Sequence, residues 1–173
     1  MMTDQQKILS LIDTMGYTSE FDDSGLDCTL TPQEVDFPPA EIHFPDEDET
    51  GIDCRLEICS CDETISREVL LFINRFNWEY AFGKIICNPY EKRICFQRYF
   101  TQDPAQIDPE TFALDFMMSS CYVSCLKQII PLVAEEKLSE SEAAEELEAM
   151  FEDIISGCTC GDDGDCDCGC SDD

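Results

Sequence analysis

Basic residues and histidine are scarce in this chain of 173 residues. Ten Lys and Arg residues stand against 39 Asp and Glu residues, which gives a formal net charge of -29 at pH 7, and His43 is the one histidine. A field of this sign repels nucleic-acid phosphates and anionic lipid surfaces. We therefore expect no nucleic-acid and no membrane partner, whereas a basic protein surface or a metal ion suits the charge. The alternative is that the charge serves only to keep the protein soluble.

Motifs for catalysis are missing as well. The sequence contains no G-x-x-x-x-G-K-[ST] phosphate loop, no dinucleotide fingerprint and no G-x-S-x-G motif. A catalytic triad would have to use His43, which alternates with the inward-facing Ile42 and Phe44 and is expected to be exposed. Carboxylates are abundant, but an acid-base pair needs a shifted pKa in a cleft. We predict no enzymatic activity, no catalytic residues and no required cofactor.

The sequence also lacks a targeting segment and a membrane span. Its first residues do not combine a basic region with an apolar one, as a signal peptide would, and no apolar run approaches the ~20 residues of a membrane span. We therefore expect a cytoplasmic protein. In a reducing compartment, the eight cysteines that precede residue 130 are expected to be mostly small buried apolar residues, not a disulfide framework.

Hydrophobic periodicity predicts an α+β fold. Apolar residues alternate with polar ones, as in half-buried strands, in 17–21, 26–30, 42–44, 52–58, 82–88 and 93–100. They recur at helical spacing in 3–15, 64–79, 108–136 and 138–155. The expected order is therefore a helix, four strands, a helix, two strands and then helices.

Local signals mark the two C-terminal helices. Asp108 followed by Pro109 is a favourable helix start. Pro131 is expected to kink this helix, because its ring clashes with the carbonyl four residues earlier. Ser139 and Glu142 form a capping box at the start of the last helix. The apolar stripe of that acidic helix either packs on the domain or is exposed as a docking element.

Three segments carry a family resemblance, which covers roughly residues 3–135. They are Gly16-Tyr17 after the first helix, the turn Asp22-Asp23-Ser24-Gly25, and the helix segment Phe72-Ile73-Asn74-Arg75-Phe76 with a hairpin directly after it. Together with the element order, these segments resemble the YbjN family, whose fold is like that of type III secretion chaperones. The Asn74-Arg75 pair looks like the family's helix-end motif. The alternative is that the pair is only the polar face at the end of an amphipathic helix.

The resemblance implies an antiparallel sheet of about five to six strands with helices packed on one face. It also implies a protein-binding module, chaperone-like or regulatory, that holds a segment of a partner protein and is often a homodimer. We divide the chain into a YbjN-like α+β domain (1–136), an acidic C-terminal helix (137–156) and a Cys/Asp/Gly-rich tail (157–173). The last two segments depart from the family. Neither the residues nor the resemblance identifies the partner-binding surface.

Two cysteine pairs allow more than one interpretation. Cys121 and Cys125 lie four residues apart on a predicted helix, hence on the same face. They are either two small core residues, which we favour, or a metal or redox pair. Cys59 and Cys61 lie near the start of a helix, and Cys59 falls on the polar face of its predicted strand. A helix N-terminus lowers a thiol pKa, so a reactive thiol is the second interpretation for Cys59.

The tail offers the sharpest chemical feature. It contains five cysteines within thirteen residues, separated by Gly and Asp: Cys158, Cys160, Cys166, Cys168 and Cys170. Four thiolates close a tetrahedral site around Zn²⁺, thiolate-rich sites also suit Cu(I), and the C-x-C spacing looks like that of metallothioneins. Neighbouring aspartates raise the pKa of the metal-free thiols, and a bound cation would reverse that cost. Metal handling is therefore our second functional hypothesis; an acidic tail with incidental cysteines and a redox role remain alternatives.

Overall fold

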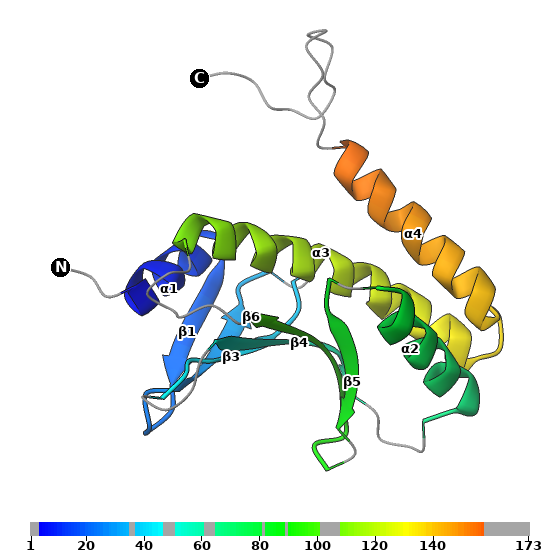
Figure 1. Ribbon diagram of the computed structural model, residues 1–173, viewed down its shortest axis with the longest axis horizontal. Helices are drawn as coiled ribbons and strands as arrows, with labels where there is room; N and C mark the ends of the chain where they lie inside the picture. Colours follow the sequence, from blue (N-terminus) through cyan, green and yellow to red (C-terminus); the bar gives the residue numbers. More distant parts are fainter. Residues whose placement is uncertain are drawn as a thin grey trace, which may run out of the picture.

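The computed structural model describes residues 4–34, 37–46, 51–60, 65–80, 82–88, 90–100 and 108–157. Within these ranges the chain forms one antiparallel sheet of six strands together with four helices (Figure 1). The strands are β1 (Tyr17–Phe21), β2 (Asp27–Pro32), β3 (Ala40–His43), β4 (Ile52–Ser60), β5 (Lys84–Asn88) and β6 (Arg93–Phe100). The helices are α1 (Asp4–Thr14), α2 (Arg67–Glu79), α3 (Pro109–Ala134) and α4 (Glu140–Gly157). The predicted α+β class and element order are confirmed.

The strands follow one another across the sheet, except at its far edge. Their spatial order is β1-β2-β3-β4-β6-β5, and every neighbouring pair is antiparallel. Helix α2 connects β4 to β5. Strand β5 lies at the outer edge of the sheet, and β6 lies between β4 and β5. The edge of the sheet that α2 approaches is therefore β5, and this places the end of α2 beside β5 and β6.

The helices cover one side of the sheet and bury the apolar face of each strand. Figure 1 shows α3 running across the sheet, with α1 near β1 and α2 near β5, while α4 lies on the outer side against α2 and α3. In β4, the residues Ile52, Cys54 and Leu56 are buried, as their period-two spacing predicts. Large aromatic side chains fill the space between sheet and helices: Tyr17, Phe72, Phe76, Phe96, Phe112 and Phe116.

Helix α3 is apolar because it forms part of this core. Among the described residues, it is the one helix that is long and apolar enough to cross a membrane by length and composition. The central helix of a globular core passes the same test, and the buried residues of α3 include Phe116, Val123, Leu126 and Ile130. Packing in the hydrophobic core therefore accounts for the apolar composition of α3.

The predicted caps of the last two helices are confirmed. The Asp108 carboxylate accepts a hydrogen bond from the backbone N–H of Thr111 at 3.0 Å, and Pro109 follows as the first helical residue. At α4, the Ser139 N–H donates to the Glu142 carboxylate at 2.9 Å, while the Glu142 N–H donates to the Ser139 hydroxyl at 3.3 Å. These reciprocal bonds satisfy N–H groups that a helix start leaves open.

Helix α4 packs on the domain as far as Phe151, whereas Ile154 is exposed. Its buried residues are Ala143, Ala144 and Leu147, and the ring of Phe151 meets that of Tyr122 edge to face, with 4.3 Å between centroids. The acidic side chains of α4 remain outside. The apolar stripe of the last helix is thus largely used within the chain, and α4 contributes an acidic flank to the end of the molecule that contains α2.

Candidate functional site

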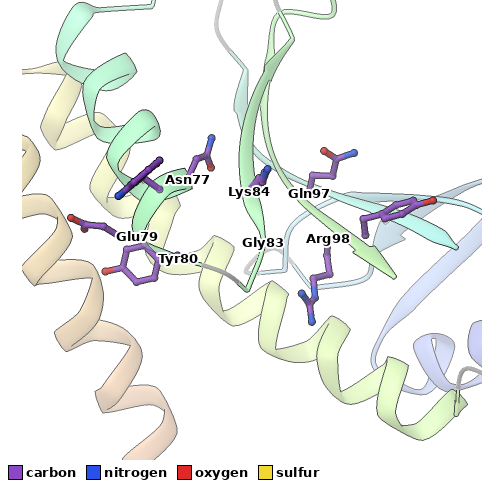
Figure 2. Close-up of a pocket in the computed structure, with 9 residues that line it drawn as sticks. Asn77, Glu79, Tyr80, Gly83, Lys84, Gln97 and Arg98 are labelled. Carbon is purple, nitrogen blue, oxygen red and sulfur yellow. The ribbon is translucent and has the colours of Figure 1, made fainter. Parts of the chain in front are cut away.

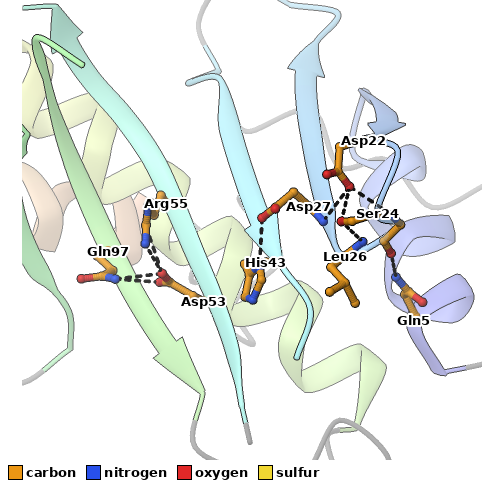
Figure 3. A network of polar contacts seen from close by, with 10 residues as sticks. Gln5, Asp22, Ser24, Leu26, Asp27, His43, Asp53, Arg55 and Gln97 are labelled. Carbon is orange, nitrogen blue, oxygen red and sulfur yellow. Dashed lines mark hydrogen bonds and ion pairs between the residues drawn. The ribbon is translucent and has the colours of Figure 1, made fainter. Parts of the chain in front are cut away.

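The sheet face opposite the helices carries polar side chains that pair with one another (Figure 3). Nδ1 of His43 lies 2.8 Å from a carboxylate oxygen of Asp27, and the His43 side chain is partly exposed on the outward face. Arg55 donates two hydrogen bonds to Asp53, which also accepts from the amide of Gln97 at 2.8 Å. These contacts pair charged and polar groups of the face with one another.

A shallow hollow of about 200 Å³ lies beside His43. The other described residues that line it are Asp27, Glu41, Asp53 and Arg55. Its lining therefore holds carboxylates and a guanidinium group, and neither a hydroxyl nor a thiol that His43 would activate as a nucleophile. The structure thus places His43 outward, as predicted, in a network of surface charges.

Of the two cysteines of α3, Cys125 belongs to the hydrophobic core. Cys125 is buried and Cys121 is half-buried. Burial raises the pKa of the Cys125 thiol, and the nearby Cys121 raises it further, so the thiolate that a metal would bind is disfavoured there. Burial likewise raises the pKa of Cys95 to about 11. Within the described residues, no group of three His, Cys, Asp or Glu side chains is arranged to hold a metal ion.

Cys59 does not lie on the polar face of β4, and that prediction was wrong. The register between β4 and β6 shifts between Glu57 and Cys59, so Glu57 lies opposite Cys95 whereas Cys59 lies opposite the buried Ile94. This β-bulge adds one residue to β4 and reverses the alternation after it. Cys59 therefore packs against the hydrophobic core, half-buried.

Two groups of predicted residues lie outside the described ranges. Cys61 is one, and the five tail cysteines are the other: Cys158, Cys160, Cys166, Cys168 and Cys170. The predicted metal ligands of the tail therefore remain a prediction from sequence.

The outer face of α2 is the most distinctive exposed feature of the described chain. The helix buries Val69, Phe72, Ile73 and Phe76. Its opposite side carries Trp78, which is 89% exposed, with Leu70 at 49% and Leu71 at 39%. Helical spacing places the polar Asn74 and Arg75 between these apolar residues. We call this set of five residues (Leu70, Leu71, Asn74, Arg75 and Trp78) the Trp78 surface.

Two hollows flank Trp78. One, of about 550 Å³, lies between the end of α2 and strands β5 and β6 (Figure 2) and is lined by Asn77, Trp78, Glu79, Tyr80, Gly83, Lys84, Gln97, Arg98 and Tyr99. The other, of about 420 Å³, lies towards the start of α4 and is lined by Leu71, Asn74, Arg75, Trp78, Glu79 and Glu140. Trp78 and Glu79 belong to both, so the indole stands on the ridge between two concave regions.

Two polar side chains that line the first hollow form hydrogen bonds within the protein. Gln97 donates to Asp53, and Arg98 donates to Asp115 at 3.0 Å. Figure 2 shows that Gln97 and Arg98 point to opposite sides of the sheet. These two side chains therefore do not converge on a point inside the hollow, as the polar groups of a small-molecule site do. The arrangement is better suited to contact with another macromolecule.

Side-chain hydrogen bonds hold α2 firmly in place. The Asn77 amide donates to the Ile85 carbonyl at 2.8 Å and accepts from the Ile85 N–H at 2.7 Å, which ties the helix to β5. On the outer face, Nε of Arg75 donates to Glu79 at 3.0 Å, one turn later. This hydrogen bond raises the pKa of Arg75, and the charge of Glu140 adds to the effect. Trp78 is therefore presented by a helix that is bonded to β5 through Asn77.

The sequence alone indicates that Trp78 lies on the surface of the helix. The apolar stripe predicted for this helix is Ile65, Val69, Phe72, Ile73 and Phe76. Trp78, the one tryptophan of the chain, falls outside that stripe. A large aromatic residue off the buried face of an amphipathic helix indicates a surface anchor, although the two hollows beside it depend on elements that are distant in sequence.

The fold and this surface define an α+β protein with a six-stranded antiparallel sheet and, in the part of the chain that the structure describes, an exposed tryptophan on the outer face of α2. No family model matches the chain, and no curated protein matches it. The resemblance to the YbjN family therefore stays a prediction that rests on the element order and on the segments around Gly16, Asp22 and Asn74.

Proposed function

We propose that this chain is a non-catalytic protein-binding module that holds a segment of a partner protein on the Trp78 surface. The observation that carries the proposal is the 89% exposure of the Trp78 side chain between two hollows, on a helix that is bonded to β5. Tryptophan is enriched among the residues that dominate binding energy at interfaces, where it fills a water-excluded contact. Isolated exposed apolar residues need no explanation, but here Leu70 and Leu71 lie on the same helix face as the indole, about two turns earlier.

The proposal extends to the setting of the protein. The YbjN-like element order supports a chaperone-like or regulatory role, and the net charge of -29 supports a partner with a basic surface. We also propose a cytoplasmic location, and a homodimer is compatible with the same resemblance. These statements depend on the sequence, and each is separable from the surface assignment.

The test compares two exposed aromatic residues. Trp78→Ala removes the anchor, whereas Tyr90→Ala removes a 96% exposed ring at the tip of the β5–β6 hairpin. Partner proteins are recovered from source cells with each variant and quantified by mass spectrometry. A protein that wild type and Tyr90→Ala recover equally, and that Trp78→Ala loses by roughly 30-fold or more, is the expected result for an anchor worth about 2 kcal/mol. Equal recovery by all three would overturn the surface assignment.

A second function, metal handling by the tail, is favoured by the five cysteines between residues 158 and 170. Cys158, Cys160, Cys166, Cys168 and Cys170 are the proposed ligands, and Zn²⁺ or Cu(I) is the proposed ion. Native mass spectrometry of the reduced full-length chain would show stoichiometric mass increments, which removal of residues 157–173 would abolish. Unchanged metal content after truncation would contradict the tail assignment.

A further inference from the structure

We propose that the segment held on the Trp78 surface is a basic amphipathic helix, whose apolar side covers Leu71 and Trp78 and whose cations face Glu140 and Glu148 of α4. This inference rests on the proposed function and specifies the chemistry of the partner. It follows from three features of the same end of the molecule: the apolar spacing on α2, the carboxylates of α4 and the bonding of the β5 edge by Asn77 at Ile85.

The apolar residues of α2 are spaced for a helical partner. Leu71 and Trp78 are seven residues apart and line the same hollow. Seven residues span about 10.5 Å along a helix, or two turns. A partner helix presents apolar side chains at the same interval along one side, and helices commonly dock into grooves through anchors at such positions.

The neighbouring carboxylates supply the complementary charge. Helix α4 contains seven acidic residues and no basic residue. Its first residue, Glu140, lines the hollow that Trp78 lines, and the charge of Glu148 contributes to the raised pKa of Tyr80 next to that surface. Neither Glu140 nor Glu148 forms an ion pair with another residue that the structure describes. Eight residues of helix separate them by about 12 Å, so two lysines two turns apart would reach both.

The indole adds a second site for a cation. A lysine or arginine side chain gains energy when it lies over the face of a tryptophan ring. Trp78 shares its hollow with Glu79, Arg75 and Glu140. Arg75 already bonds to Glu79, so Glu140 is the carboxylate of this hollow that forms no ion pair with another described residue. A basic residue of the partner that crosses this hollow would therefore meet both an aromatic face and carboxylates, whereas an acidic segment would meet like charge.

An extended partner strand would be obstructed at Ile85. Strand β5 is the edge of the sheet, and a peptide added to that edge would need the outward N–H and C=O groups of Ile85. The Asn77 amide already bonds to both groups. A partner can still contact the outer side of α2 and the acidic side of α4. Both elements are helices, and a partner helix packs against a helix by interdigitation of side chains.

The first experiment uses three synthetic peptides of ~14 residues, near the length at which isolated helices become stable. One has Leu at helical amphipathic spacing with Lys elsewhere, the second replaces every Lys by Glu, and the third scrambles the Lys/Leu order. Because Trp78 is the one tryptophan of the chain, its fluorescence reports binding to the full-length protein directly. We expect a saturable blue shift with the first peptide only. Equal shifts with the scrambled peptide, or none with any peptide, would overturn the basic-helix inference.

The second experiment locates the charge contact with matched variants. The double variant Glu140→Gln/Glu148→Gln removes two charges at the proposed site. The double variant Glu20→Gln/Glu34→Gln removes two exposed charges near β1 and β2, at the other edge of the sheet. Anisotropy of the labelled Lys/Leu peptide is expected to show an affinity loss of about 3- to 10-fold for the first pair and little for the second. Equal losses would show general attraction to the net charge and would overturn the assigned contact.

The failures of the two proposals are distinguishable. Loss of the natural partner in Trp78→Ala without binding of the Lys/Leu peptide supports the protein-binding module and overturns the basic helix as its ligand. Retention of the natural partner by Trp78→Ala overturns the surface itself, and with it this inference, whatever the peptides do. Circular dichroism of each variant checks that its fold is unchanged.

Discussion

Glu136 ends α3 in a left-handed backbone conformation, with φ of 56°. Its N–H donates to the Val133 carbonyl at 3.1 Å, and the Lys137 N–H donates to the Leu132 carbonyl at 2.9 Å. This pattern closes many helices, usually with glycine at the left-handed position. Glu136→Gly is therefore expected to raise the free energy of unfolding by about 1 kcal/mol, because the Cβ strain of the left-handed region disappears. Urea denaturation measures the change.

The adjacent Glu135 provides the control. Its φ is -87°, so glycine relieves no strain there and only adds conformational freedom to the unfolded chain. Glu135→Gly is expected to lower the stability slightly, while Glu136→Gly raises it. The same sign for both substitutions would contradict the role given to the left-handed residue.

Among the elements, the contact between α2 and β5 depends most clearly on one side chain. The Asn77 amide takes the place of a neighbouring strand at Ile85, donating to its carbonyl and accepting from its N–H. Asn77→Ala leaves both backbone groups without these bonds in a partly buried place, and we expect a loss of about 1–3 kcal/mol in urea denaturation. Because the substitution also opens the sheet edge, light scattering should detect more self-association.

Asn74→Ala is the matched control for this prediction. Asn74 lies one turn earlier on α2 and is exposed, so its removal is expected to change the stability by less than about 0.5 kcal/mol. If the two alanine variants unfold at the same urea concentration, the Asn77 bonds do not anchor the helix. The presentation of Trp78 would then depend on the buried face of α2 alone.

The elements were predictable where the pattern is local. Strands 17–21 and 93–100 were predicted with the bounds that the structure shows. Helix α2 begins at Arg67 instead of residue 64, because Ser66 caps it by accepting from the Val69 N–H. The position of Cys59 was not predictable, since the bulge that turns it inward arises where β4 pairs with β6, a strand far along the chain. Alternation within one strand contains no information about such a shift.

At the scale of the whole molecule, the same limit applies to the candidate site. The amphipathic pattern of 64–79 predicts which side of α2 is buried, and thereby that Trp78 is not on it. The hollows on either side of Trp78 require Glu140 from α4 and Lys84 from β5 as walls. That arrangement depends on β6 lying between β4 and β5, an order that follows from tertiary packing and not from any local pattern.

The net charge of -29 also makes a prediction for the molecule as a whole. Folding brings like charges together, so screening should stabilise the folded state more than the expanded chain. Raising NaCl from ~0.01 M to ~0.1 M shortens the screening length from about 30 Å to about 10 Å. A rise in Tm of about 2–4 °C would correspond to about 1 kcal/mol for a chain of this size. Scanning calorimetry across the salt series measures it.

The shape of the salt dependence separates screening from other salt effects. Screening acts mainly at low ionic strength, since most of the long-range repulsion is already removed when the screening length falls below the size of the molecule. Preferential exclusion of salt from the surface instead strengthens burial in proportion to concentration. We therefore expect Tm to rise steeply up to ~0.1 M and then to level off. A Tm that is flat at low salt and rises only above this range would contradict this expectation. It would show that repulsion among the acidic residues, those of α4 included, does not destabilise the folded state. A basic partner would then bind these residues without relieving any such repulsion.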